Sequence, residues 1–301
     1  MLVTTIIISY NTAKLTAQAV KSVVHDARQS QIEYEVIVVD NASIDNSVEV
    51  IKKLKQQYPE IKLIQNQENL GFAKANNQAI KQAKGEYLFL LNSDTQVKPS
   101  SLLSLLQAFN QDPSLGVASA YLITPEGRPQ QSQGGDLPRL VSVASQMFFL
   151  DDLPFLGRFL PSTQKRYLKL KKTKKVGWVA GTAMMIKNQV IDTVGLLDEE
   201  IFMYAEDMDF CLRARQIGFQ VAIVPKAQIV HYGSASSSSA RAIEGEFMGL
   251  LYLFKKHLPS WQLPLLKLVL IAGASLRVLL FAMMGKKEKS QLYKQILANL
   301  N

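Results

Sequence analysis

Three carboxylates occur within four consecutive residues, at Glu206, Asp207 and Asp209. The helix dipole favours acidic side chains in the first turn of a helix, which by itself would account for one or two of them. Crowded carboxylates also repel one another, and this raises the pKa of one member and suits it to remove a proton from a substrate. Asp207 is therefore the candidate general base.

A second polar cluster, Asn92-Ser93-Asp94, directly follows the apolar run of residues 87–91. Side chains two residues apart on an extended chain point to the same side, so Asn92 and Asp94 can approach one ligand. Mg²⁺ and Mn²⁺ prefer carboxylate oxygen, and His231, after another apolar run, could add a neutral imidazole. Taken singly, an Asn-x-Asp is more often a turn cap, and a lone histidine at a strand end is more often structural.

The elements that position these clusters alternate along the first 120 residues. β-branched runs predict strands at residues 3–9, 35–39, 61–65, 87–91 and 116–121, and helical periodicity predicts helices at 12–27, 46–58, 73–84 and 100–110. This alternation predicts right-handed βαβ units and a mostly parallel sheet in an α/β fold. Ligands of such sheets bind beyond the carboxyl ends of the strands, so residues 9–11, 40–43 and 92–94 should share one edge.

The second half of the chain is less regular. Residues 122–175 are rich in proline and glycine, which indicates an irregular excursion that could form an acceptor loop. Order resumes at residues 177–186. The pattern then predicts a helix over residues 206–218 and a strand over 220–224 that leads to His231.

The chain becomes helical from Arg241. Residues 263–284 are strongly apolar, but Lys267 and Arg277 interrupt them. A spanning helix needs about 20 apolar residues with few charges, so a helix lying in the membrane surface is favoured over a span. Packing onto the body of the protein or onto a second copy is the alternative. We divide the chain into a catalytic domain, 1–240, and an amphipathic helical extension, 241–301, that associates with a membrane.

Composition narrows the class of protein further. A chain of 301 residues with 48% hydrophobic content suits one large α/β domain with an appendix. A net charge of +9 attracts anionic lipid, phosphorylated ligands or nucleic acid, and the apolar runs of the basic tail argue against nucleic acid. Cys211 is the single cysteine, and no basic segment precedes the apolar start of the chain. We therefore expect a cytoplasmic protein at the inner face of the membrane.

Six motifs in this order resemble those of glycosyltransferase family 2, within it the bacterial rhamnosyltransferase-like and galactofuranosyltransferase-like branches. They lie at residues 8–11, 38–45, 69–77, 90–95, 179–183 and 205–214, followed by His231. The resemblance implies a GT-A fold and inverting transfer of a hexosyl group, with rhamnose as the leading sugar, from a dTDP- or UDP-sugar. It implies a polysaccharide or lipid-linked glycan as acceptor and Mg²⁺ or Mn²⁺ as cofactor.

The resemblance also implies roles by position. On the donor side, Asp40 would contact the nucleobase, and the donor pocket would be lined by Asn11, Asn69 and Lys74. Asn92 and Asp94 would occupy the family's Asp-x-Asp slot, and the metal would be held by Asp94 and His231. Asp207 would be the base, and the acceptor site would be formed by Trp178, Gly181, Thr182 and Glu206. The sequence departs from the family at Asn92, which stands where the first acid is usual. Many members of these branches tolerate Asn there, so the metal is retained, and weaker or indirect coordination is the alternative.

Other classes of protein remain to be weighed. No G-x-G-x-x-G follows the first predicted strand and no G-x-x-x-x-G-K-[ST] occurs, which argues against a dehydrogenase and a P-loop protein. A catalytically inactive relative that binds a glycan or a nucleotide is the alternative to an enzyme. The intact acidic cluster at residues 206–209 favours the enzyme. Assembly of the chain into a homo-oligomer is a further possibility that the sequence leaves open.

Overall fold

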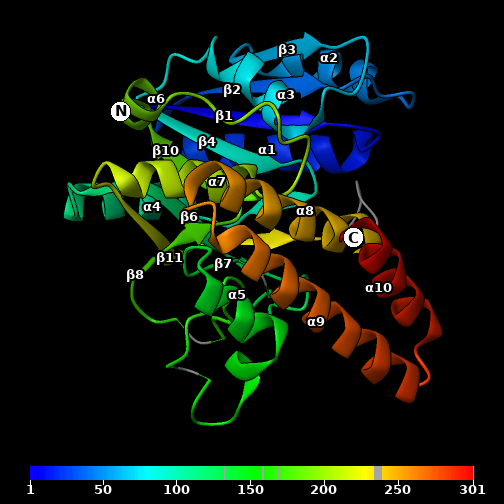
Figure 1. Ribbon diagram of the computed structural model, residues 1–301. Helices are drawn as coiled ribbons and strands as arrows, with labels where there is room; N and C mark the ends of the chain where they lie inside the picture. The colour runs from blue at the N-terminus through cyan, green and yellow to red at the C-terminus, as the bar shows by residue number, and fades with distance from the viewer. Residues whose placement is uncertain (132, 158, 169, 234–238, 301) are drawn as a thin grey trace. The chain divides into compact units, whose positions relative to one another are not determined.

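The structure is a computed structural model that describes residues 1–301 except 132, 158, 169, 234–238 and 301 (Figure 1). The chain forms two compact units. The first unit comprises Met1–Gln133 with Arg166–Ser236, and the second comprises Gly134–Lys165 with Ser237–Asn301. The division of the chain at residue 240 stays a prediction.

The first unit begins with the predicted alternation of strands and helices. Its elements are β1 (Leu2–Ser9), α1 (Ala13–Gln29), β2 (Glu33–Asp40), α2 (Ser47–Gln57), β3 (Ile61–Gln65), α3 (Gly71–Ile80), β4 (Tyr87–Asn92), β5 (Thr95–Val97), α4 (Ser101–Gln111) and β6 (Leu115–Ile123). The predicted strands and helices of this half are confirmed. The short strand β5 was not predicted, because three residues carry too little periodicity to stand out.

The second half of this unit completes the sheet. It contributes β8 (Lys174–Val176), β9 (Trp178–Val179), β10 (Ala183–Lys187), α6 (Asn188–Val194), α7 (Glu206–Gln216) and β11 (Gln220–His231). The strand order is β3-β2-β1-β4-β10-β6-β11-β5, with β8 paired to β11. Strands β3, β2, β1 and β4 are parallel, whereas β10 runs antiparallel between β4 and β6. The mixed sheet confirms the predicted α/β fold.

Strand β11 is longer than the sequence predicted. We expected one strand over residues 220–224 and a second apolar strand, 227–230, that ends at His231, but β11 runs through both with a register shift between Val224 and Gln228. Pro225 lies inside this shift and has no backbone N–H to donate, so pairing is interrupted there and then resumes. The continuation carries His231 to the level of β5.

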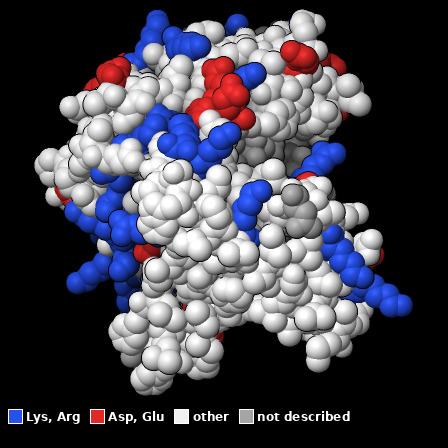
Figure 2. All heavy atoms as spheres, viewed as in Figure 1, with Lys and Arg blue, Asp and Glu red and all other residues white. Residues whose placement is uncertain are grey.

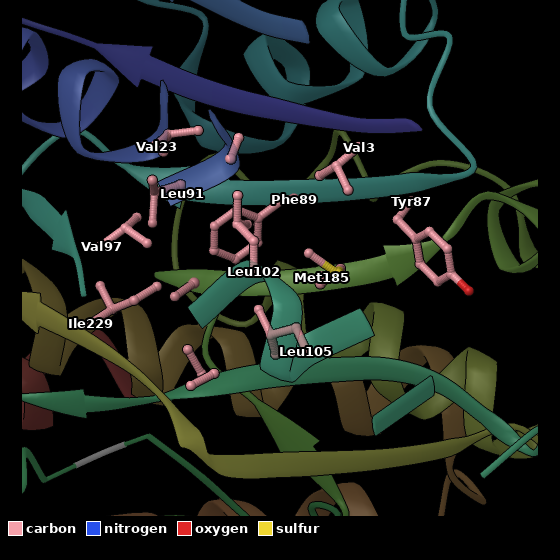
Figure 3. Packing of buried hydrophobic residues seen from close by; sticks show 14 of the residues in the cluster. Val3, Val23, Tyr87, Phe89, Leu91, Val97, Leu102, Leu105, Met185 and Ile229 are labelled. Carbon is pink, nitrogen blue, oxygen red and sulfur yellow. The ribbon is translucent and has the colours of Figure 1, made fainter. Parts of the chain in front are cut away.

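The core of the first unit lies against both faces of the sheet. Val36, Ile37, Val38 and Val39 of β2 are all fully buried, and successive side chains of a strand point to opposite faces. Figure 3 shows side chains of β1, β4 and β10 meeting those of α1 and α4. A sheet covered in this way exposes its strand ends, which are where ligands can reach polar side chains.

The second unit is helical. It contains β7 (Gly134–Gly135), α5 (Leu140–Met147), a 3₁₀ turn η1 (Leu150–Asp152), α8 (Ser239–His257), α9 (Gln262–Met283) and α10 (Lys287–Leu300). The predicted helical tail is confirmed. Helix α5 was not predicted, because the prolines and glycines around it hide a pattern of two turns. Among the described residues, α9 is long and apolar enough to cross a membrane, with a mean hydropathy of 2.1.

Helix α9 buries one face, formed by Leu266, Leu270, Gly273, Ala274 and Arg277. A Cβ on Gly273 would lie 2.7 Å from the Cβ of Met147, so glycine permits the close approach of α5. We had counted Arg277 as a charge against a membrane span, but it is buried. Its guanidinium donates to the carbonyl oxygens of Met147 (2.5 Å), Gln146 (3.0 Å) and Gly273 (3.2 Å).

Candidate active site

The three polar strand ends meet at one edge of the sheet, as predicted. Ser9 at the end of β1 is paired in register with Asp40 of β2, and Ile8 with Asn92 of β4. Asp40 is 2% exposed, and its Oδ2 accepts a hydrogen bond from the Ser43 N–H at 3.0 Å. Its Oδ1 is buried without a hydrogen-bond partner in the described part of the chain. Buried oxygens are rarely left unsatisfied, so a ligand donor suits this position.

Two of the predicted donor-binding residues also hold loops together. The Asn11 Oδ1 accepts from the Ile44 N–H at 2.8 Å, and Asn11 adopts a left-handed backbone with φ +55°. The Asn69 Oδ1 accepts from Asn41 Nδ2 at 2.8 Å and from the Gly71 N–H at 3.0 Å. Their amide oxygens are therefore engaged within the protein, and their amide nitrogens are the groups each could offer a ligand. Lys74 is exposed on α3.

Asp94 and His231 are brought into contact by the pairing of β5 with β11. The register places His231 opposite Thr95, and the Tyr232 N–H donates to the Asp94 carbonyl at 2.9 Å. The His231 Nε2 then lies 3.3 Å from the Asp94 Oδ1. Both side chains are largely buried. These two residues form a pair that converges on one point at the sheet edge.

This pair fits a divalent cation. Ligands placed 2.0–2.1 Å from Mg²⁺ at right angles are about 3 Å apart, close to the observed separation. Magnesium usually takes one or two protein ligands, and substrate phosphates and waters complete the octahedron. Among the described residues no group of three His, Cys, Asp or Glu side chains surrounds a common point. The donor set therefore suits an ion shared with a phosphate.

The acidic cluster begins at a strained turn. Tyr204 and Ala205 both have left-handed backbones, with φ +71° and +81°, just before α7 starts at Glu206. Left-handed conformations of residues other than glycine cost free energy and gather at functional sites. The turn fixes the direction in which the side chains of Glu206 and Asp207 project from the first turn of α7.

Asp207 is held by two backbone donors. Its Oδ2 accepts from the Gly181 N–H at 2.9 Å and its Oδ1 from the Met208 N–H at 2.7 Å. Burial raises the pKa of Asp207, and these hydrogen bonds oppose the rise. Burial, with a further contribution from the charge of Asp207, raises the pKa of Glu206 to about 8. The Glu206 Oε2 has no hydrogen-bond partner in the described part of the chain.

Asp209, the third carboxylate, has a structural role. It is fully buried, and its Oδ2 accepts from Arg213 Nε at 2.8 Å one turn along α7. The same guanidinium donates to the carbonyl oxygens of Val194 and Leu196. Asp209 therefore anchors α7 to the segment that follows α6, and Glu206 and Asp207 are left for chemistry.

The segment after β9 connects the two halves of the site. The Gly181 N–H holds Asp207, and the carbonyl of the next residue, Thr182, accepts from the Asn92 N–H at 2.9 Å. A Cβ on Gly181 would lie 3.3 Å from the Phe72 ring and 3.7 Å from the Asp207 Cβ, which is tight. Residues 181 and 182 therefore connect Asp207 to the end of β4, two residues before Asp94. Trp178, predicted for the acceptor site, is 4% exposed.

Sequence reasoning missed three amide side chains of this region. Asn41 holds the loop that precedes α3 through Asn69 and through the Gly71 carbonyl. Gln130 contacts His231, and Gln133 lies buried nearby. Glutamines in a proline- and glycine-rich stretch carry no local signal, because their role depends on partners that are distant in the chain.

Comparison with known proteins agrees with the fold. A sequence model described as glycosyl transferase family 2 matches residues 4–195. An uncharacterised protein of Sinorhizobium fredii is 29% identical over 67% of the chain, which spans 22% of that protein. The N-acetylglucosaminyl-diphospho-decaprenol L-rhamnosyltransferase of Mycobacterium tuberculosis is 26% identical over 76% of the chain and 78% of its own length. The solved mannosyltransferase PcManGT from Pyrobaculum calidifontis, in complex with GDP-Man and Mn²⁺, covers 99% of the chain and 84% of its own at 18% identity, with a TM-score of 0.56.

Proposed function

Because the chain belongs to glycosyl transferase family 2, we propose that it is a metal-dependent glycosyltransferase that inverts the configuration of the sugar it transfers. The donor is a nucleoside diphosphate-sugar, and the acceptor is a hydroxyl of a polysaccharide or a lipid-linked glycan. One observation carries the proposal. Residues 180–182 link Asp207 to the strand end that bears Asp94, which contacts His231.

The residues have complementary roles in a single displacement. The acceptor oxygen bonds to the anomeric carbon as Asp207 takes the hydroxyl proton, and the bond between that carbon and the diphosphate oxygen breaks. The two hydrogen bonds to Asp207 keep one of its faces fixed while the proton is transferred. A divalent cation, when bound by Asp94 and His231, neutralises the charge that develops on the leaving diphosphate.

Glu206 is proposed to bind the acceptor in its neutral form. Its pKa of about 8 keeps a proton on this carboxyl at neutral pH, and its neutrality favours the negative charge of Asp207. A protonated carboxyl can donate to an acceptor oxygen, whereas an ionised one can only accept. The buried Glu206 Oε2, which has no hydrogen-bond partner among the residues that the structure describes, is the atom suited to this contact.

Rhamnose is the leading donor sugar. The support is the mycobacterial relative, a rhamnosyltransferase that is 26% identical to the chain. Asp40, Asn11, Asn69 and Lys74 are proposed to bind the nucleotide, and Trp178, Gly181 and Thr182 to border the acceptor. The alternative is an inactive relative that binds a glycan or a nucleotide without turnover.

Release of nucleoside diphosphate tests the proposal. Purified protein is incubated with Mn²⁺, a lipid-linked acceptor and dTDP-rhamnose or a series of UDP-sugars. We expect turnover with one donor and a 10²- to 10⁴-fold lower kcat for Asp207→Asn, because the amide cannot accept the proton. Asp192→Asn, an exposed acid on α6, is the matched control and should keep wild-type turnover. Unchanged turnover in Asp207→Asn would refute the base, and no turnover with any donor would favour the inactive relative.

The helical tail is proposed to lie on an anionic membrane at the cytoplasmic face. Trp261, Leu265, Leu268, Leu279 and Met283 recur at helical spacing, and each is at least 44% exposed. They lie opposite the buried face of α9. In Figure 2 the surface along α9 is mostly white, with blue spheres at the lower right where Figure 1 places α10. Residues 237–301 hold nine basic and three acidic residues, which adds electrostatic attraction to the apolar contact.

A further inference from the structure

Two glutamines, Gln130 and Gln133, form a hydrogen-bonded pair, which we call the clasp, beside the candidate cation site. The Gln130 Oε1 is 2.8 Å from the His231 Nδ1. An amide oxygen can only accept, so Nδ1 carries a proton, and in the neutral imidazole Nε2 keeps its lone pair. That lone pair faces the Asp94 Oδ1 at 3.3 Å. In the neutral ring this lone pair and the Asp94 carboxylate can bind one cation together, whereas in the imidazolium form Nε2 would donate to Asp94 instead.

The position of Gln130 is itself fixed. Its N–H donates to the Leu122 carbonyl at 2.9 Å, and its own carbonyl accepts from Gln133 Nε2 at 2.7 Å. The Gln133 Oε1 in turn accepts from the Leu122 N–H at 2.7 Å. Gln133 is 1% exposed, so its side chain is held without competition from water. Both backbone groups of Leu122 are thus bound by the clasp.

The clasp is also connected to the candidate base, Asp207, through two neighbouring backbone groups. The Gln133 carbonyl accepts from the Ala180 N–H at 3.1 Å, and the neighbouring Gly181 N–H holds Asp207. This short segment therefore contacts His231 directly and is connected to Asp207 through residues 180 and 181.

We infer that Gln130 is a positioning residue that selects the Nδ1–H tautomer of His231 and directs Nε2 at the cation, and that Gln133 holds Gln130 in place. The inference rests on the proposed cation site. Partners of this kind in the outer shell of a metal site fix ring orientation, and their loss typically weakens metal affinity 10- to 100-fold.

The test measures Mn²⁺ affinity in the presence of UDP by electron paramagnetic resonance. Gln130→Met keeps the size of the side chain and removes the acceptor, and we expect affinity 10- to 100-fold weaker than wild type. Gln130→Glu keeps an acceptor oxygen and should bind within about threefold of wild type. Gln131→Met changes the exposed neighbour and should match wild type. Thermal unfolding confirms that each variant is folded.

A second measurement needs no variant. The ¹⁵N shifts of His231 in the metal-free protein, recorded at a pH where the ring is neutral, report which nitrogen carries the proton. We expect it on Nδ1, and a proton on Nε2 would overturn the inference. Wild-type Mn²⁺ affinity in Gln130→Met would overturn it as well and leave the cation site standing. No Mn²⁺ binding by the wild-type protein would instead refute the cation site and, with it, the role of Gln130.

Discussion

The two units differ in where they place apolar side chains. In the first unit the strands are buried on both faces, and the exposed large hydrophobic side chains are scattered. Fifteen of the twenty-three exposed large hydrophobic side chains among the described residues belong to the second unit, although it is the shorter one. Phe155 is 81% exposed, Phe159 72% and Met283 84%. Soluble surfaces rarely gather so much apolar area, so the second unit is suited to an apolar neighbour.

The units also bury ionisable side chains of different types. The first unit buries Glu206 and keeps Asp207 in an environment that raises its pKa, which prepares carboxylates for proton transfer. The second unit buries Arg277, whose guanidinium lies 4.3 Å from the centre of the Phe149 ring and donates to three carbonyls. Arg277 is therefore used for packing in the second unit, as Asp209 is in the first, whereas Glu206 and Asp207 are the candidates for chemistry.

The largest expected effect is the difference between substitutions on the buried face and on the exposed face of α9. Leu270→Glu places a carboxylate at a fully buried position, which costs several kcal/mol, and we expect loss of the cooperative unfolding of the second unit. Leu268→Glu, at a position 64% exposed, should change stability by less than about 0.5 kcal/mol. It should nevertheless weaken binding to anionic vesicles about tenfold or more, because a buried leucine contributes roughly 1.5–3 kcal/mol. Circular dichroism and vesicle co-sedimentation measure the two effects.

Zwitterionic vesicles are the control, and wild-type protein should bind them less tightly than anionic ones. Wild-type binding by Leu268→Glu would show that the outer face of α9 does not contact lipid. Sedimentation velocity would then ask whether this face pairs with a second copy of the chain.

A smaller effect tests the structural use of buried charge. Arg277→Met removes all the guanidinium donors and leaves buried carbonyls unsatisfied, so we expect a loss of about 2–3 kcal/mol in the free energy of unfolding. Lys267→Met changes an exposed cation of the same helix and should be close to neutral. Urea unfolding measures both variants. Equal stabilities would mean that the hydrogen bonds of Arg277 do not support the fold of this unit.

The smallest effect concerns pH. The pKa of Glu206 is raised from 4.5 to about 8, so between these values the folded state binds a proton that the unfolded state has released. Stability should therefore fall as pH rises through this window. We expect the Tm of the ligand-free protein to drop by a few degrees between pH 5.5 and 8.5, and to drop less in Glu206→Gln. An equal drop in both proteins would place the titrating group elsewhere.

Much of the fold and part of the site could be predicted from local patterns. β-branched runs and helical periodicity located the strands and helices of the first half, because burial on a sheet or a helix face imposes a period on neighbouring residues. Parallel strands also predicted that Asp40 and Asn92 share an edge, and the register confirms it. The acidic cluster at residues 206–209 was visible as composition alone.

Only the tertiary structure decided which of these residues work together. Contact between Asp94 and His231 depends on the pairing of β5 with β11, and the role of Asp209 depends on Arg213 drawing it into the core. The sequence could not distinguish the buried face of α9 from its exposed face, because leucine lies on both. Local sequence specifies the period and type of an element, whereas partners distant in the chain determine burial, charge pairing and the direction of a side chain.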